Sequence, residues 1–76
     1  GKDRMASNRV WNLMYVLGNT GRVTGDAANP QEKVGALSGA EHVSTNGWRV
    51  WVEHHKTGKR LFESDAEKEH MAASAV

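Results

Sequence analysis

The sequence contains no cysteine and only one proline among its 76 residues. The lack of cysteine excludes a disulfide scaffold and every zinc site that needs thiolate ligands. Small secreted domains usually depend on such cross-links, so we expect an intracellular, cytoplasmic protein. The longest apolar stretch, residues 13–17, is far too short to cross a bilayer, and no membrane partner is expected.

The sequence also has almost no excess of charge. Its net charge of +1 gives no overall attraction for nucleic acid or acidic lipid, so any electrostatic argument has to be local. Apolar residues make up 38% and charged residues 25%, which is typical of a folded globular protein and too apolar for a disordered one. We therefore predict a single domain over residues 1–76, with residues 1–6 disordered or derived from an expression vector.

Residues 8–17 fit either a strand or a helix. As a strand, Trp11, Leu13, Tyr15 and Leu17 share one face, whereas as a helix Val10, Met14 and Leu17 share one stripe. Aromatic and β-branched residues favour the strand. The segment that follows, Gly18-Asn19-Thr20-Gly21, is typical of a hairpin turn, so the strand is the preferred interpretation.

The middle of the chain predicts a short helix. Asn29 is a good N-cap residue, and Pro30 suits the first helical position. We expect the helix to run from Pro30 to about Ser38, to bury Val34 and Leu37, and to stop at Gly39.

A second hairpin is predicted after residue 46. Residues 48–53 alternate in the period of a half-buried strand, with Trp48, Val50 and Val52 on one face. Residues 56–59 form the turn, and residues 60–63 return antiparallel to the first strand.

The last helix is predicted from a capping-box pattern. Ser64 is expected to accept hydrogen bonds from the first free N–H groups, and Glu67 to reach back to the backbone of Ser64. The helix should run from Asp65 to about Ala73, with the following candidate inward positions: Ala66, His70, Met71 and Ala73.

These elements suggest an internal repeat. A shift of 37 residues aligns Trp11 with Trp48 and Gly21 with Gly58, which relates residues 7–39 to residues 44–76. Chance matching would also explain this similarity. With the repeat, the predicted fold class is α+β: a small antiparallel sheet of about four strands with two helices on one face.

No pattern in the sequence indicates catalysis. His54 and His55 are adjacent on a predicted strand, so they should point to opposite faces and not share a metal ion. The acidic residues from Glu63 to Glu69 suit the start of a helix, where negative charge is favoured. No nucleophile motif or phosphate-binding loop is present. We therefore expect no enzyme, no catalytic residue, no metal, no cofactor and no small-molecule substrate.

The second hairpin is the strongest candidate for a binding site. It carries four cations against the single acid Glu53, and Trp51 lies on the face opposite the core-directed residues. A basic hairpin with an exposed aromatic ring could contact phosphates and stack on a base. The predicted nucleic-acid-binding residues are Arg49, Trp51, Lys56, Lys59 and Arg60. The same charges would also fit a solvated hairpin that resists edge-to-edge aggregation.

The second half of the chain also carries a family-like pattern. It consists of Gly47-Trp48-Arg49-Val50-Trp51-Val52, Gly58-Lys59-Arg60, Phe62-Glu63-Ser64, Glu67, Ala72 and Ala73. In these motifs, residues 47–73 resemble the arm-type DNA-binding domain of phage and integrative-element tyrosine recombinases. In that family a small sheet enters the major groove and the following helix backs it. The resemblance implies that Arg49, Trp51, Lys59 and Arg60 face DNA.

The sequence therefore predicts a small non-enzymatic binding domain of the kind encoded by phages, plasmids or other mobile elements. Nucleic acid is the leading partner. The alternative is a protein-interaction or homodimerisation module, because three tryptophans are more than so short a chain is expected to bury.

Overall fold

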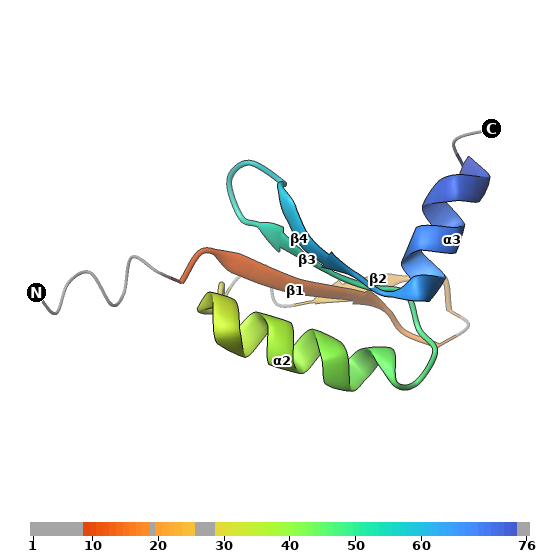
Figure 1. Cartoon of the computed structure of the whole chain (residues 1–76), viewed down its shortest axis with the longest axis horizontal. Coiled ribbons are helices and arrows are strands. Elements are labelled where there is room, and N and C mark those ends of the chain that lie inside the picture. Colours follow the sequence, from red (N-terminus) through yellow and green to blue (C-terminus); the bar gives the residue numbers. More distant parts are fainter. Residues whose placement is uncertain (1–8, 19, 26–28, 75–76) are drawn as a thin grey trace, which may run out of the picture.

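The computed structural model describes residues 9–18, 20–25 and 29–74 (Figure 1). Along the chain the elements are β1 (Trp11–Val16), β2 (Val23–Gly25), α2 (Lys33–Ser44), β3 (Val50–His54), β4 (Arg60–Glu63) and α3 (Asp65–Ser74). The strand-strand-helix order thus occurs twice. The segment 1–6, predicted to be disordered or vector-derived, lies outside the described residues.

The four strands form one antiparallel sheet in the order β2-β1-β3-β4. The two central strands pair with Leu13 opposite Val52. Residues 11–16 are therefore a strand, which confirms the preferred of the two interpretations. Gly18 and Gly21 have φ angles of 50° and 71°, in the left-handed region that glycine tolerates best, as expected for the predicted turn.

The core lies between the central strands and α2, which runs along one face of the sheet (Figure 1). Val50 and Val52 are fully buried against Ala36 and Ala40 of the helix. Since the two alanines are four residues apart, they lie on one face of the helix, and their small side chains let it approach the sheet closely. The predicted α+β class, with four antiparallel strands and two helices, is confirmed.

The predicted bounds of the first helix were wrong. The backbone of Gln31 exchanges hydrogen bonds of 2.8 and 3.1 Å with Trp11, so the chain is still extended there and Asn29 cannot cap the helix. The helix instead begins at Lys33 and continues through Gly39. Val34, predicted to be buried, is 79% exposed, because the helix turns its alanine face to the sheet.

The second hairpin follows the prediction. Val50 and Val52 face the core, and β3 and β4 are joined by a turn in which Gly58 has a φ of 75°. The hydroxyl of Ser64 accepts a hydrogen bond of 3.3 Å from the N–H of Glu67, as a cap should. The second bond of a capping box, from the N–H of Ser64 to the Glu67 side chain, is missing, because this N–H donates to the carbonyl of Val50 at 2.8 Å. The prediction that the Glu67 side chain reaches back to Ser64 was therefore wrong.

Only the first turn of α3 is buried. Glu67 is 1% exposed, whereas the predicted inward residues Met71, His70 and Ala73 are all exposed and Ala66 is half-buried. The helix starts at the end of β4 and projects from the end of the sheet (Figure 1), so it has no apolar surface to cover beyond its first turn. Among the described residues, neither helix is long and apolar enough to span a membrane.

Candidate nucleic-acid interface on the second hairpin

A buried carboxylate joins β4 and the residue that precedes β3 to α3. Oε1 of Glu67 accepts a hydrogen bond of 2.7 Å from Nε of Arg49, and Oε2 accepts one of 2.8 Å from Nη1 of Arg60. Nη1 of Arg60 also donates to Glu63 at 2.9 Å. We call Arg49, Arg60, Glu63 and Glu67 the Glu67 cluster. Its two cations and two carboxylates leave it without net charge.

The ionisation of this cluster is set by burial and by pairing, which act in opposite directions. Burial alone would raise the pKa of Glu67, but the hydrogen bonds and charges of Arg60 and Arg49 outweigh it and hold that pKa below its ordinary value. Burial alone would lower the pKa of Arg60, and its bonds to Glu67 and Glu63 raise it instead. Glu67 and Arg60 are therefore charged at neutral pH, and their charges are satisfied within the protein.

Trp51 lies beneath the same arginines. The guanidinium carbon of Arg60 is 4.6 Å from the centre of the Trp51 ring, and that of Arg49 is 5.9 Å away. The indole Nε1 donates to Oε1 of Glu53 at 2.7 Å, and the residue is only 6% exposed. The sequence predicts an exposed ring that could stack on a base. The structure corrects this, because the two arginines cover the ring.

The turn of the hairpin carries the remaining two predicted residues, Lys56 and Lys59, and both are exposed. The turn itself is held by hydrogen bonds. Nδ1 of His54 accepts bonds from the N–H groups of Lys56 at 3.1 Å and Thr57 at 3.3 Å. The Thr57 hydroxyl accepts a bond of 3.2 Å from the N–H of Lys59. The two lysines therefore project from an ordered backbone.

Two further cations lie at this end of the molecule. The carbonyl of Val10 accepts a bond of 2.8 Å from the N–H of His55, which places Arg9 next to the turn. Lys33 begins α2 close to the pairing of Gln31 with Trp11. We call the four exposed cations the basic end: Arg9, Lys33, Lys56 and Lys59.

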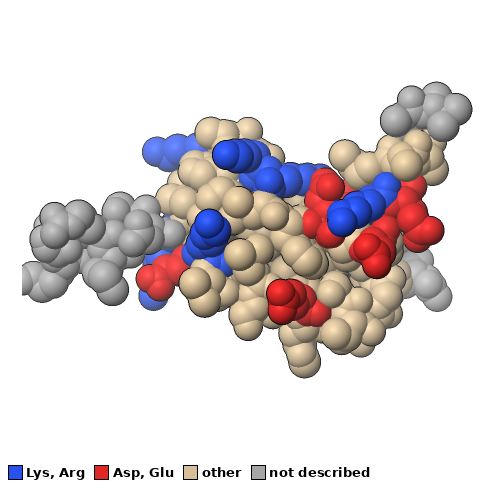
Figure 2. Space-filling view, viewed as in Figure 1, with Lys and Arg blue, Asp and Glu red and all other residues tan. Residues whose placement is uncertain are grey.

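The basic end has little opposing charge. Glu32 is the neighbouring exposed acid, and none of the ion pairs found in the described part of the chain involves the four cations. Figure 2 shows lysine and arginine atoms gathered toward this end of the visible face, and carboxylates gathered around the start of α3. Cations thus predominate at one end of the visible face, and carboxylates predominate at the other.

The structure corrects the prediction for His54 and His55. Their ring centres are 5.3 Å apart and their planes are inclined by 31°, so the rings lie side by side. The alternation of a strand does not apply, because β3 ends at His54 and His55 begins the turn. No group of three or more histidine, cysteine, aspartate or glutamate side chains in the described residues could hold a metal ion.

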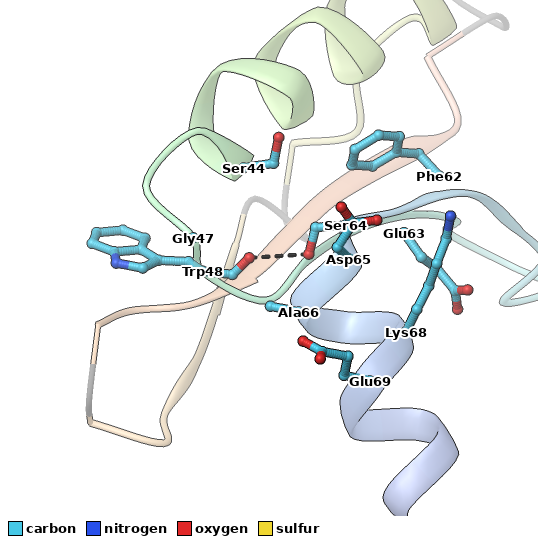
Figure 3. A pocket seen from close by; sticks show the side chains of 10 residues that line it. All are labelled: Ser44, Gly47, Trp48, Phe62, Glu63, Ser64, Asp65, Ala66, Lys68 and Glu69. Carbon is cyan, nitrogen blue, oxygen red and sulfur yellow. Dashed lines mark hydrogen bonds between the residues drawn. The ribbon is translucent and has the colours of Figure 1, made fainter.

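A hollow of about 500 Å³ opens between the loop after α2 and the start of α3 (Figure 3). The sequence gives no sign of this hollow, because its walls come from segments that meet only in the fold. Its two serine hydroxyls are both engaged: Oγ of Ser64 donates to the carbonyl of Trp48 at 3.0 Å, and Oγ of Ser44 donates to the carbonyl of Glu41 at 2.7 Å. No histidine or cysteine is among the described residues that line the hollow, so neither hydroxyl has a base to activate it. The exposed carboxylates of Asp65 and Glu69 lie at this acidic end.

Comparisons with protein-family models, with curated proteins and with solved structures give no match to this chain.

Proposed function

We propose that the protein is a small non-enzymatic domain that binds the phosphate backbone of nucleic acid through its basic end. The observation that carries this proposal is that four exposed cations share one end of the molecule and form no ion pair with any other described residue. Cations that are not neutralised within the protein are free to replace the counterions of a polyanion.

This proposal divides the five residues predicted from the sequence into two groups. Lys56 and Lys59 belong to the binding surface. Arg49, Trp51 and Arg60 instead hold the hairpin and α3 together, since both guanidinium groups are bound to Glu67 and cover the indole ring. Phosphate contacts carry no sequence information directly, so a surface that contacts phosphates predicts binding with little sequence preference.

The test is the affinity for a labelled mixed-sequence DNA duplex, followed by fluorescence anisotropy between about 50 and 200 mM salt. Four phosphate contacts predict a slope of log affinity against log salt of roughly −3 to −4. The double variant Lys56→Glu with Lys59→Glu should bind at least about tenfold more weakly.

The matched control is Arg22→Glu with Lys68→Glu, which makes the same change in net charge at exposed positions away from the basic end. It should change the affinity much less, by about threefold at most. Equal weakening by the two double variants would show that only net charge matters. Either that result or an unchanged affinity in the first variant would overturn the proposed site.

A protein-interaction or homodimerisation module is the second candidate, and the exposure of α3 favours it. Met71 is 46% exposed on a helix whose residues 68–74 are all exposed. A helix this short is marginal in water unless something packs against it. Sedimentation at high protein concentration tests this role: a concentration-dependent mass that Met71→Glu abolishes would support it, and a strictly monomeric mass would count against homodimerisation.

A further inference from the structure

His54 holds the turn that presents two of the four cations of the basic end. Its Nδ1 atom accepts the N–H groups of Lys56 and Thr57 at 3.1 and 3.3 Å. Its ring lies perpendicular to that of Trp11 of β1, with the ring centres 5.2 Å apart and the planes at 85°. The side chain thus acts as a local cap for the turn, in the way that an asparagine or aspartate side chain often does.

An imidazole nitrogen accepts a hydrogen bond only when it carries no proton. In the neutral ring one nitrogen is an acceptor, whereas in the protonated ring both are donors. Protonation of His54 would therefore remove the acceptor from two backbone N–H groups and place a third N–H against them. The turn would lose both bonds at once.

We propose that the protonation of His54 regulates the basic end, by releasing the turn that carries Lys56 and Lys59. This inference rests on the proposed function, because it concerns the control of that same site. Histidine is the side chain that most often changes charge between about pH 5 and 8, so mild acidification is the signal.

The groups around His54 are mostly cationic. On its own hairpin they are Glu53, His55, Lys56 and Lys59, and the carbonyl of Lys59 accepts the N–H of His54 at 2.8 Å. Glu53 is already bound by the indole of Trp51. From the segment packed beside the turn, Trp11 is uncharged and Arg9 adds one cation.

Acidification would therefore have two opposite effects on phosphate binding. A proton on His54 or on His55 adds positive charge to the basic end, which favours binding. A proton on His54 also frees the turn, so that binding must order it again at a cost in free energy. The two histidines separate these effects, because only His54 accepts bonds from the turn.

The experiment compares the wild type with His54→Asn and His55→Asn. Asparagine at position 54 supplies an acceptor oxygen that does not titrate, and His55→Asn is the matched control. Backbone order parameters of Lys56 and Thr57, whose N–H groups bind the imidazole, are measured by NMR without nucleic acid at about pH 7.5 and pH 5.5. In the wild type and His55→Asn they should fall from about 0.85 to below about 0.6, and in His54→Asn they should not change.

Two outcomes of this first measurement would overturn the proposal. One is an ordered turn at both pH values in the wild type, and the other is an equal loss of order in His54→Asn. In the wild type, ring ¹⁵N shifts report the protonation of His54 directly. The pH at which half of the order is lost should equal the pH at which half of the His54 rings are protonated. Two different midpoints would contradict the proposal, independently of the result for His54→Asn.

Binding to the labelled duplex is the second measurement. Each variant keeps one titrating imidazole at the turn, so the added charge is matched. For each variant, the affinity at about pH 5.5 is divided by the affinity at about pH 7.5. This quotient should be about three- to tenfold smaller for His55→Asn than for His54→Asn, because only His55→Asn keeps the histidine that releases the turn. Equal ratios would overturn regulation by His54. An absence of binding at either pH would refute the proposed function instead, and the order parameters would still test the switch of the turn.

Discussion

Oε2 of Glu67 lies 2.8 Å from Nη1 of Arg60, so the buried start of α3 is bound to an edge strand of the sheet. The same carboxylate holds Arg49, and the two arginines enclose the Trp51 ring. The rest of α3 is exposed. The Glu67 cluster therefore ties the first turn of this helix to the sheet.

Replacing Glu67 by glutamine should lower the free energy of unfolding by about 2–3 kcal/mol. The substitution keeps the shape of the side chain but leaves two guanidinium groups without the buried carboxylate. Urea denaturation followed by tryptophan fluorescence measures the effect. The control is Glu69→Gln, an exposed position on the same helix, which should change the stability by less than about 0.5 kcal/mol. A similar loss in both variants would contradict the assigned role.

The stability difference between the wild type and Glu67→Gln should depend on pH. The pKa of Glu67 in the folded state lies below its ordinary value of about 4.5, so the ionised carboxylate stabilises the fold above that pH. This contribution is lost as the pH falls from the ordinary value through the folded-state pKa. Urea midpoints of both proteins should differ at neutral pH and converge as the pH falls below the folded-state pKa of Glu67. Other carboxylates are common to both proteins, so a constant difference would contradict this prediction.

The sequence predicted the sheet correctly because alternation and turn chemistry are local signals. Val50 and Val52 alternate with polar or covered residues, and the glycines of both turns adopt positive φ angles. The helices were predicted less well, because their burial depends on tertiary contacts. The face of α2 that packs on the sheet consists of Ala36 and Ala40, whereas the larger Val34 points to solvent.

Two glycines of α2 should respond in opposite ways to substitution. A Cβ atom at Gly35 would lie 3.4 Å from the side chain of Gln31, an ordinary contact, so Gly35→Ala should stabilise the protein by about 0.5–1 kcal/mol through helix propensity. A Cβ atom at Gly39 would lie 3.0 Å from Cδ2 of Leu13. The larger side chain in Gly39→Val should therefore cost about 1–3 kcal/mol. Thermal unfolding of both variants measures these shifts, and destabilisation by Gly35→Ala would be the contrary result.

The candidate site shows a different limit of sequence reasoning. In the sequence, nothing distinguishes Arg49 and Arg60 from the other hairpin cations, Lys56 and Lys59. It does not show that a glutamate from the next helix neutralises the two arginines, because the capping-box pattern assigns the side chain of Glu67 to another partner. The backbone N–H that it would have bound is taken by Val50, and this competition exists only in the folded sheet.

Adjacent cations of the hairpin should consequently separate binding from stability. Lys59→Gln should leave the free energy of unfolding within about 0.5 kcal/mol of the wild type, because the side chain is exposed and makes no ion pair in the described residues. It should weaken duplex binding severalfold and reduce the salt slope by about 1. Arg60→Gln should instead cost about 1–2 kcal/mol of stability, because it removes bonds to two carboxylates and the guanidinium over Trp51.

Measured at a temperature where it is fully folded, Arg60→Gln should bind the duplex within about twofold of the wild type. The two variants remove the same charge from neighbouring positions, so each serves as the control for the other. The opposite pattern, with binding lost in Arg60→Gln and kept in Lys59→Gln, would return the binding surface to the sheet face implied by the recombinase resemblance. The arginines would then have to leave Glu67 to reach DNA, and stability and affinity would change together.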